Sequence, residues 1–392
     1  MAKATIKDID IKNKTVLMRA DFNVPQDDSL KITDDTRIKA TLPTIKFLLD
    51  NGVKKLVLIS HLGRPDGKVV AKYSLKPVAE RLTQLLGQQV KFVNDCVGDE
   101  IKNEVSAAKE KVVLLENLRF HAEEEANDPG FAKKLSELGE LYVNDAFGTA
   151  HRAHASTEGV TKYLKGVAGF LLEKEIVYLN DAIKNPKRPF MVILGGAKVS
   201  DKIGVIENLL PKSDCILIGG GMAYTFLKAQ GKDIGNSKLE KDKVDLAKAI
   251  LEKAKTLNKK IILPIDHLVV DNVDPQAKTE IVDIIPEGKI AVDIGPKTIE
   301  LFKDALKNVQ TVVWNGPLGI FEMDNFSNGT KEIAIFLTSI KAVTIIGGGD
   351  TAAAVAKFKV EDKMTHISTG GGASLEFMEG KLLPGVAALS EK

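Results

Sequence analysis

Short runs of apolar residues alternate with amphipathic stretches along the whole chain. Most runs are almost entirely apolar, which is typical of strands covered on both faces. The pattern predicts strands at 15–19, 55–60, 90–93, 112–115 and 141–144 in the first half, and at 190–194, 215–218, 261–265, 290–294, 311–314, 343–346 and 366–368 in the second. Strands that alternate with helices indicate parallel α/β layers.

Three amphipathic stretches carry helix signals. Those at 41–51 and 75–86 end before Gly52 and Gly87, and glycine is common just past a helix end. A third, 171–185, must end at the segment between Pro186 and Pro189. Because 392 residues are many for one core, we expect two domains. The predicted parts are an N-terminal domain at 1–170, a connecting hinge helix at 171–189 and a C-terminal domain at 190–378.

Composition excludes several classes of protein. The chain is 44% hydrophobic and 28% charged, with a net charge of +2, which disfavours a nucleic-acid or membrane partner because both need a concentrated basic surface. The first residues have no apolar core of a signal peptide, and no run approaches a membrane span. Cys96 and Cys215 lack metal-ligand spacing, so we expect neither a disulfide framework nor a zinc site. A cytoplasmic location fits best.

The arginines are few and selectively placed. Only seven of the 55 basic residues are arginine, and all seven lie in the first 188 residues. Five stand at predicted strand ends and turns: Arg19, Arg37, Arg64, Arg119 and Arg152. A guanidinium group grips carboxylate and phosphate by two-point contacts, whereas lysine offers a mobile point charge. The pattern therefore predicts a site for a small, multiply charged anion in the first half.

Other polar residues of the first half leave alternatives open. Asp21 and Asn23 share one face of an extended segment and would accept bonds from hydroxyl groups, or they form an Asx turn before Pro25. His61 is interpreted as an anion-binding residue, not a proton-transfer residue. His151 and His154 resemble half a metal site, but without a third ligand nearby we reject a metal there.

Four glycine-rich loops mark the second half. The segments 191–202, 215–226, 343–355 and 366–377 each run from an apolar strand through glycines into a helical pattern. Such loops present N–H groups to anions, although a single one often serves only a tight turn. Four together, with Lys198, Lys202 and Asp350 beside them, favour a phosphate-bearing ligand. Asp350 is an N-cap, a Mg²⁺ ligand or both.

The absence of two common nucleotide-binding motifs limits the classes of protein to which the chain could belong. There is no GxxxxGK[ST] motif, which excludes a P-loop ATPase, and no GxGxxG followed by an acidic residue, which disfavours a standard dinucleotide fold. Pro317 marks a tight turn after a strand, where Asn315 and Glu322 are placed to face a ligand. Trp314 is expected in the core.

Together these segments resemble the phosphoglycerate kinases. The matching motifs occur in order along the whole chain: RADFNVP, DDTRI, SHLGRP, LENLRFH, AHRAHAS, GGAKVSDK, GGGMAYTF, WNGPLGIFE, GGGDTAAA, STGGGASLEF and GKLLPGV. Small departures, such as Lys39 where an arginine is common and the Phe377–Met378 pair in place of two leucines, touch no position assigned to chemistry.

The resemblance implies two doubly wound, Rossmann-like domains that face each other across a cleft, with the tail 379–392 packed on the first. It implies reversible transfer of a phosphoryl group from 1,3-bisphosphoglycerate to MgADP, giving 3-phosphoglycerate and MgATP, in line and after domain closure. The implied cofactor is Mg²⁺ on Asp350, and the expected state is a monomer.

The resemblance also implies roles for individual residues. Those that hold the three-carbon acid and its phosphate are Asp21, Asn23, Arg37, His61, Arg64, Arg119 and Arg152. Those that hold the nucleotide and its metal are Lys198, Lys202, Asn315, Glu322, Gly348, Gly349, Asp350 and Thr351, with Gly219, Gly220, Gly221 and Gly295 at the adenine. The groups expected to act on the moving phosphoryl group are Arg37, Lys198, Lys202, Gly349 and Gly372.

This chemistry needs no general base, because the attacking carboxylate is already ionised, with an ordinary pKa of about 3.5. The absence of a His–Asp dyad motif is therefore expected. Two other functions compete with this hypothesis: a nicotinamide-dependent dehydrogenase, and a non-catalytic two-lobed anion-binding protein. The missing dinucleotide motif disfavours the first, and the start of the chain and the Asp350 loop disfavour the second.

Overall fold

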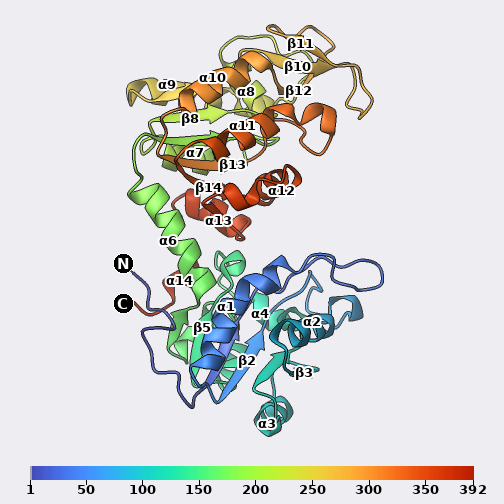
Figure 1. The fold of residues 1–392 in the computed structure, drawn as a ribbon, viewed down its shortest axis with the longest axis vertical. Helices are drawn as coiled ribbons and strands as arrows, with labels where there is room; N and C mark the ends of the chain where they lie inside the picture. The colour runs from blue at the N-terminus through green and yellow to red at the C-terminus, as the bar shows by residue number, and fades with distance from the viewer. Residues whose placement is uncertain (1) are drawn as a thin grey trace. The chain divides into compact units, whose positions relative to one another are not determined.

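The computed structural model describes residues 2–392 and falls into two compact units (Figure 1). Unit 1 comprises Met1–Ile176 and Leu382–Lys392, and unit 2 comprises Val177–Lys381. The division falls inside α6 (Phe170–Lys184), so it does not set 171–189 apart as a separate segment. That this segment acts as a hinge stays a prediction.

Unit 1 is built on a six-stranded parallel sheet of order β3-β4-β2-β1-β5-β6. Its strands are β1 (Thr15–Arg19), β2 (Lys55–Ile59), β3 (Val90–Val93), β4 (Val112–Leu115), β5 (Leu141–Asn144) and β6 (Gly166–Ala168). Its helices are α1 (Thr36–Asp50), α2 (Lys76–Leu86), α3 (Asp99–Ala107), α4 (Ala122–Glu125), α5 (Pro129–Ser136) and α14 (Pro384–Ala387), with 3₁₀ turns η1 (Ala71–Tyr73), η2 (Leu118–Phe120), η3 (Phe147–Thr149) and η4 (Gly159–Lys162).

The core of unit 1 explains the apolar strands. Val16 and Leu56 belong to one apolar cluster with Ile45 of α1 and Leu82 of α2. Leu17 and Val57, which point to the opposite face, are also fully buried. Both faces of the sheet are therefore covered, as the apolar runs predicted. Sequence analysis missed β6, because three residues are too few to show a pattern.

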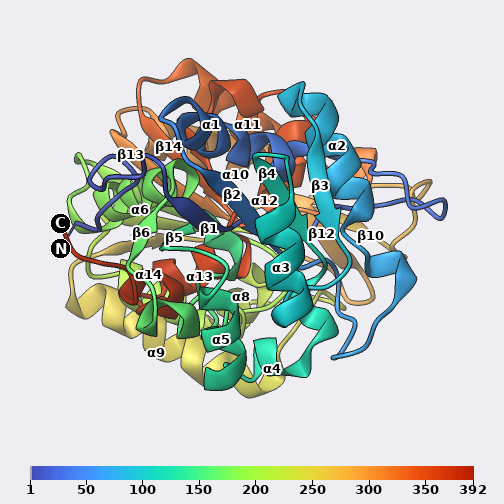
Figure 2. The ribbon, with the colours of Figure 1, turned by 90° about the horizontal axis from the view of Figure 1, so that it is seen from below.

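The two chain ends belong to unit 1 and lie side by side (Figures 1 and 2). The Lys392 amide donates to the Ala2 carbonyl (2.9 Å), and the Ala4 amide donates to the Ser390 carbonyl (2.9 Å). From β5, the Asn144 side chain donates to the Gly385 carbonyl at 3.1 Å. Residues 382–392 thus complete unit 1, although more than 200 residues separate them from the rest of it.

Unit 2 holds a six-stranded parallel sheet of order β15-β14-β13-β7-β8-β9 and a three-stranded sheet of order β11-β10-β12. The strands are β7 (Phe190–Leu194), β8 (Cys215–Ile218), β9 (Lys260–Ile262), β10 (His267–Val270), β11 (Glu280–Val282), β12 (Ile290–Ile294), β13 (Thr311–Asn315), β14 (Val343–Gly347) and β15 (His366–Ile367). The helices are α7 (Ile203–Leu209), α8 (Ala223–Ala229), α9 (Val244–Thr256), α10 (Pro296–Leu306), α11 (Asn328–Ser339), α12 (Gly349–Lys357) and α13 (Gly372–Met378), with 3₁₀ turns η5 (Lys241–Lys243), η6 (Asp324–Phe326) and η7 (Glu361–Lys363).

The small sheet corrects one prediction. The strand at 290–294 exists as β12, but it pairs antiparallel with β10 and lies outside the parallel sheet. Sequence analysis missed β10 and β11, since β11 is largely exposed and has no apolar face to reveal it. The strand predicted at 261–265 ends at Ile262, shortly before Pro264, which has no N–H to donate to a neighbouring strand.

Among residues 2–392, none of the helices combines the length and the apolar character that crossing a membrane requires.

Candidate active site

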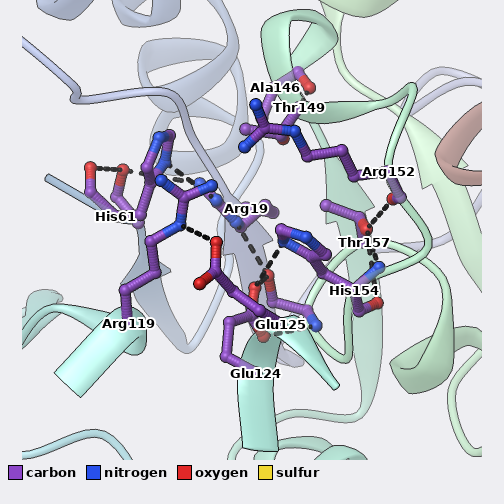
Figure 3. A network of polar contacts seen from close by, with 12 residues as sticks. Arg19, His61, Arg119, Glu124, Glu125, Ala146, Thr149, Arg152, His154 and Thr157 are labelled. Carbon is purple, nitrogen blue, oxygen red and sulfur yellow. Dashed lines mark hydrogen bonds and ion pairs between the residues drawn. The ribbon is translucent and has the colours of Figure 1, made fainter. Parts of the chain in front are cut away.

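Basic side chains of unit 1 converge at the carboxyl edge of its sheet. Arg19 ends β1, His61 follows β2, Arg119 lies in η2 after β4, and Arg152 follows β5 and η3. Because the carboxyl ends of neighbouring parallel strands meet at one edge, residues that are far apart in sequence come together here (Figure 3). We call these four residues, with Arg37 and His154, the basic patch.

Arg19 forms the buried floor of the patch. The residue is only 1% exposed. Its Nε donates to Ser156 Oγ at 2.9 Å, and its Nη2 lies 3.2 Å from His61 Nδ1. Its Nη1 donates to the Ala20 carbonyl oxygen. Through these contacts Arg19 holds Ser156 and His61 in place.

His61 lies where the positive charges of the patch meet. It is buried, and both burial and the charges of Arg19, Arg119, Arg37 and Arg152 hold its pKa well below the ordinary value. The imidazole is therefore neutral at physiological pH. A neutral ring among four guanidinium groups adds hydrogen bonding without further repulsion.

Arg119 carries an unsatisfied donor. The residue is 3% exposed, its Nη1 donates to the Gly63 carbonyl at 2.9 Å, and its Nε lies 3.1 Å from Glu125 Oε1. Its Nη2 is buried and has no hydrogen-bond partner among residues 2–392. Since a buried charged donor without a partner is costly, this atom indicates a place for an anionic acceptor.

Arg37 and Arg152 are more accessible than Arg19 and Arg119. Arg37, in the first turn of α1, pairs with Asp21 through an Nη1–Oδ2 distance of 2.6 Å, and its side chain is 37% exposed. Arg152 is partly buried, and its Nε donates to His151 Nε2 at 3.2 Å. These two guanidinium groups can reorient toward a ligand.

The remaining predicted residues of unit 1 lie on neighbouring loops. Asn23 Oδ1 accepts a hydrogen bond from the Gly63 amide at 2.9 Å, and the Asn23 amide donates to Asp21 Oδ1 at 3.2 Å. The second contact shows that the Asx turn is formed, whatever else Asp21 does. Arg64 is exposed and makes no hydrogen bond or ion pair with any part of the chain that the structure describes.

Glu124, which sequence reasoning missed, lies next to His154 in the network of polar contacts (Figure 3). Glu124 is fully buried and accepts bonds from the Ser156 amide (2.9 Å) and hydroxyl (2.5 Å). His154 Nδ1 lies 3.8 Å from Glu124 Oε1, and burial together with the nearby arginines lowers the His154 pKa to about 3. Nothing in the run Glu123–Glu125 indicates which of its three carboxylates is buried.

In unit 2, three glycine loops touch through their backbones. A Cβ added at Gly195, after β7, would lie 2.0 Å from the Pro317 carbonyl oxygen. One added at Gly220, after β8, would lie 2.7 Å from the Gly196 amide nitrogen, and Gly220 also has a φ of +65°. Glycine is thus required here by close packing, which brings the loops together at the carboxyl edge of the sheet.

Gly195→Ala is expected to lower the free energy of unfolding of unit 2 by about 3 kcal/mol or more, because neither backbone can yield without opening the loops. Urea denaturation followed by the fluorescence of Trp314, the only tryptophan, reports this unit. Gly349→Ala is the control, since its Cβ would meet open space. Equal stabilities of the two variants would contradict the packing argument.

These loops border a cavity of about 460 Å³ in unit 2. The residues that line it include Gly196, Gly220, Gly221, Tyr224, Val292, Pro317, Glu322 and Asp350. Apolar walls with a few polar groups suit a flat ring with a charged tail. Glu322 and Asp350 thus line the same cavity, and their role in binding a ligand stays a prediction.

A buried side-chain amide without a hydrogen-bond partner among residues 2–392 lies beside the start of α12. Asn315, at the end of β13, is 1% exposed, yet neither its Nδ2 nor its Oδ1 has a hydrogen-bond partner among residues 2–392. A Cβ at Gly348 would lie 3.0 Å from that Nδ2, a tight contact, and the φ of +85° at Gly348 favours glycine. Thr351 is buried and accepts the Gly316 amide at 2.6 Å, which ties α12 to the β13 loop.

The lysines and the other glycines that were predicted to bind the nucleotide lie in several different loops of unit 2. Lys202 precedes α7, and burial lowers its pKa while Asp201, Asp350 and Glu379 oppose that effect. Lys198 is exposed in the β7 loop, and Gly372 begins α13. Gly219 packs against Leu318, and Gly295 packs against Asp266 and does not line the cavity. The predicted roles of these residues stay predictions.

Comparisons with known proteins agree with one another. A family model described as Phosphoglycerate kinase matches residues 6–381. A phosphoglycerate kinase of Thermosipho africanus is 55% identical over 399 aligned residues, covering 100% of this chain and 99% of the relative. One of Koribacter versatilis is 57% identical, with 100% of both covered. The chain belongs to the phosphoglycerate kinase family.

Solved structures of phosphoglycerate kinases show the same fold. The structure from Coxiella burnetii has a TM-score of 0.91 at 41% identity, and that from Pyrococcus horikoshii has 0.84 at 35%, each covering 98% of both chains. The resemblance seen in the motifs and the two-domain Rossmann-like α/β fold are confirmed.

As a phosphoglycerate kinase, the chain is a glycolytic phosphotransferase that acts on a carboxyl group, and the hypotheses of a dehydrogenase and of a non-catalytic binding protein are wrong. It reversibly transfers a phosphoryl group from 1,3-bisphosphoglycerate to ADP, giving 3-phosphoglycerate and ATP.

Proposed function

We propose that the basic patch of unit 1 binds 3-phosphoglycerate and that the cavity of unit 2 binds ADP or ATP. The observation that carries the first assignment is the buried, unpartnered Nη2 of Arg119 beside a neutral His61. The four guanidinium charges at this sheet edge exceed the three carboxylates of Asp21, Glu125 and Glu124 that lie among them, so the patch favours a negatively charged ligand.

For the nucleotide, the support lies in the loops after β7, β8, β13 and β14. The cavity walls accept the base, and the start of α12 offers N–H groups to phosphate oxygens. Asn315 has an unpartnered amide that is suited to a phosphate or ribose oxygen. Lys198, Lys202 and the α13 start at Gly372 would neutralise the phosphoryl group during transfer.

The residues around Asp350 fit the expected Mg²⁺. Asp350 is exposed at the cavity in the first turn of α12, so its carboxylate would hold the ion while water and phosphate oxygens would supply the other ligands. The ion would shield the charge of the phosphates. Lys202, whose pKa responds to Asp350, lies close enough to share that task.

In the proposed mechanism the protein aligns the reactants and neutralises charge. The 3-phosphoglycerate carboxylate is ionised at neutral pH, so no residue has to remove a proton. Arg37 would hold the acid and the moving phosphoryl group, while Lys198 and Lys202 hold the nucleotide phosphates. Transfer then requires the two units to bring the substrates together and exclude water. We further propose that the enzyme is a cytoplasmic monomer.

A coupled assay tests the proposal as a whole. The protein is supplied with 3-phosphoglycerate and MgATP, and a glyceraldehyde-phosphate dehydrogenase step converts the product with loss of NADH absorbance. Turnover that needs both substrates and Mg²⁺ supports the assignment. If turnover continued after chelation of the metal, Mg²⁺ would not be a cofactor of the reaction.

Asp350→Ala is expected to weaken MgADP binding about tenfold or more, since a charged contact contributes roughly 1.5–3 kcal/mol, and to leave 3-phosphoglycerate binding nearly unchanged. Isothermal titration with each ligand measures both affinities. Asp324→Ala, which removes a carboxylate that is 93% exposed and outside the cavity lining, is the control. Equal losses for both ligands would indicate misfolding instead.

A further inference from the structure

Asp95, Cys96 and His121 bring three potential metal ligands together in unit 1. Asp95 and Cys96 follow β3, and His121 lies between η2 and α4. The Asp95 carboxylate oxygen, the Cys96 Sγ and an imidazole nitrogen of His121 all lie within 4.8 Å of one another. Sequence spacing gave no sign of this cluster, because α3 and β4 separate its members along the chain.

The local bonds hold these side chains in place. Asp95 Oδ1 accepts the Cys96 amide at 2.7 Å and lies 2.6 Å from His121 Nε2. The His121 ring also packs on Phe131 at a centroid distance of 5.3 Å. Small rotations of His121 and Asp95 would open the Oδ1–Nε2 contact enough to admit an ion that bridges both.

We propose that Asp95, Cys96 and His121 bind a borderline-soft divalent cation of the Zn²⁺ class, with water as the fourth ligand. One sulfur, one nitrogen and one oxygen donor suit tetrahedral Zn²⁺. They do not suit Mg²⁺, which prefers oxygen ligands in an octahedral arrangement. The site is therefore chemically distinct from the one proposed for the nucleotide.

Burial and charge support the same inference. Cys96 is fully buried, whereas the side chains of His121 and Asp95 are 28% and 46% exposed, so an ion can reach the thiol past them. The Asp95 carboxylate, which accepts the Cys96 amide, places negative charge beside the thiol. A bound cation would displace the thiol proton and be stabilised by this carboxylate.

If His121 and Asp95 served only as a hydrogen-bonded pair, no thiol would be needed beside them, whereas a metal site uses all three side chains. With an ion bound, the loop after β3 and the segment between η2 and α4 become cross-linked. His121 is two residues from Arg119, so the cross-link would steady the backbone beside the basic patch without using any of its side chains.

Titration of the full-length protein with Co²⁺ alone, as a spectroscopic stand-in for Zn²⁺, tests the proposal. We expect a thiolate-to-cobalt charge-transfer band in the near ultraviolet that Zn²⁺ abolishes by competition. Cys96→Ala should lose the band, and His121→Asn should weaken Co²⁺ binding roughly tenfold or more. His121 is partly exposed, so its variant is informative even if Cys96→Ala fails to fold.

Cys215→Ala is the matched control, because Cys215 is the other buried free cysteine and is not part of any three-residue metal-ligand cluster found in residues 2–392. It should keep both the band and the affinity. Absence of the band in the parent protein, its persistence in Cys96→Ala, or unchanged affinity in His121→Asn would each overturn the proposal.

Discussion

Arg37→Ala is expected to lower kcat by roughly 10²-fold or more, as loss of one donor to a transition-state oxyanion does. Arg37 lies in the first turn of α1 and is 37% exposed, so its removal leaves no cavity in the core. Its charge reaches His61, which places it at the basic patch. The coupled assay with saturating 3-phosphoglycerate and MgATP measures the effect, and circular dichroism checks the fold.

Arg81→Ala is a closely matched control. Arg81 is also in unit 1, is 35% exposed, and pairs with Asp35 at 2.7 Å, much as Arg37 pairs with Asp21 at 2.6 Å. It lies on α2 and is not among the arginines whose charges lower the His61 pKa, which are Arg19, Arg119, Arg37 and Arg152. Arg81→Ala should keep nearly full turnover. If both variants lost turnover equally, the loss would reflect a general effect of removing surface charge, and Arg37 would have no role in catalysis.

The parts of the fold that the sequence predicted are those governed by burial. Strands such as β1 and β13 are covered on both faces, and their apolar runs predicted them to within a residue. β11 is exposed and β6 has only three residues, so neither leaves a pattern to detect. The orientation of β12 depends on its partner β10, which is a tertiary property that a run of apolar residues does not encode.

In the candidate site, too, the sequence predicted some residues and missed those whose role depends on tertiary contacts. Arg119 and Asp350 are at strand ends or helix starts, where their residue types have a chemical meaning that the sequence displays. Glu124 acts through the Ser156 segment packed against it, and one glutamate among three gives no signal. The cluster of Asp95, Cys96 and His121 was missed for a related reason, since His121 follows a different strand from the other two residues. The sequence therefore predicts which residues lie at the end of a strand better than it predicts contacts between segments that follow different strands.

Another buried carboxylate, Asp145, is expected to make stability strongly dependent on pH. It follows β5, is fully buried, and its Oδ1 accepts the amides of Leu171 (2.8 Å) and Leu172 (3.2 Å) at the start of α6. Its Oδ2 is buried and has no hydrogen-bond partner among residues 2–392. Burial raises the pKa of Asp145 to about 7. The folded protein thus retains a proton there that the unfolded chain has already released.

The sign of the effect follows from this proton. Between the ordinary pKa of 3.8 and the folded value of about 7, the folded state binds more protons, so the free energy of unfolding falls as pH rises. The full difference corresponds to about 4 kcal/mol. Asp145→Asn keeps an oxygen acceptor for Leu171 and Leu172 but carries no charge. The variant should therefore lose this component, and its advantage over the parent should grow from about pH 4 to about pH 7.

Urea denaturation followed by far-ultraviolet circular dichroism at several pH values measures the difference, because Trp314 fluorescence reports unit 2 and Asp145 belongs to unit 1. Asp28→Asn removes an exposed carboxylate of the same unit and controls for the change in net charge. A difference between Asp145→Asn and the parent that stayed constant with pH would show that Asp145 is ionised throughout. In that case the first turn of α6 would be held by a charged cap, and burial would not control its titration.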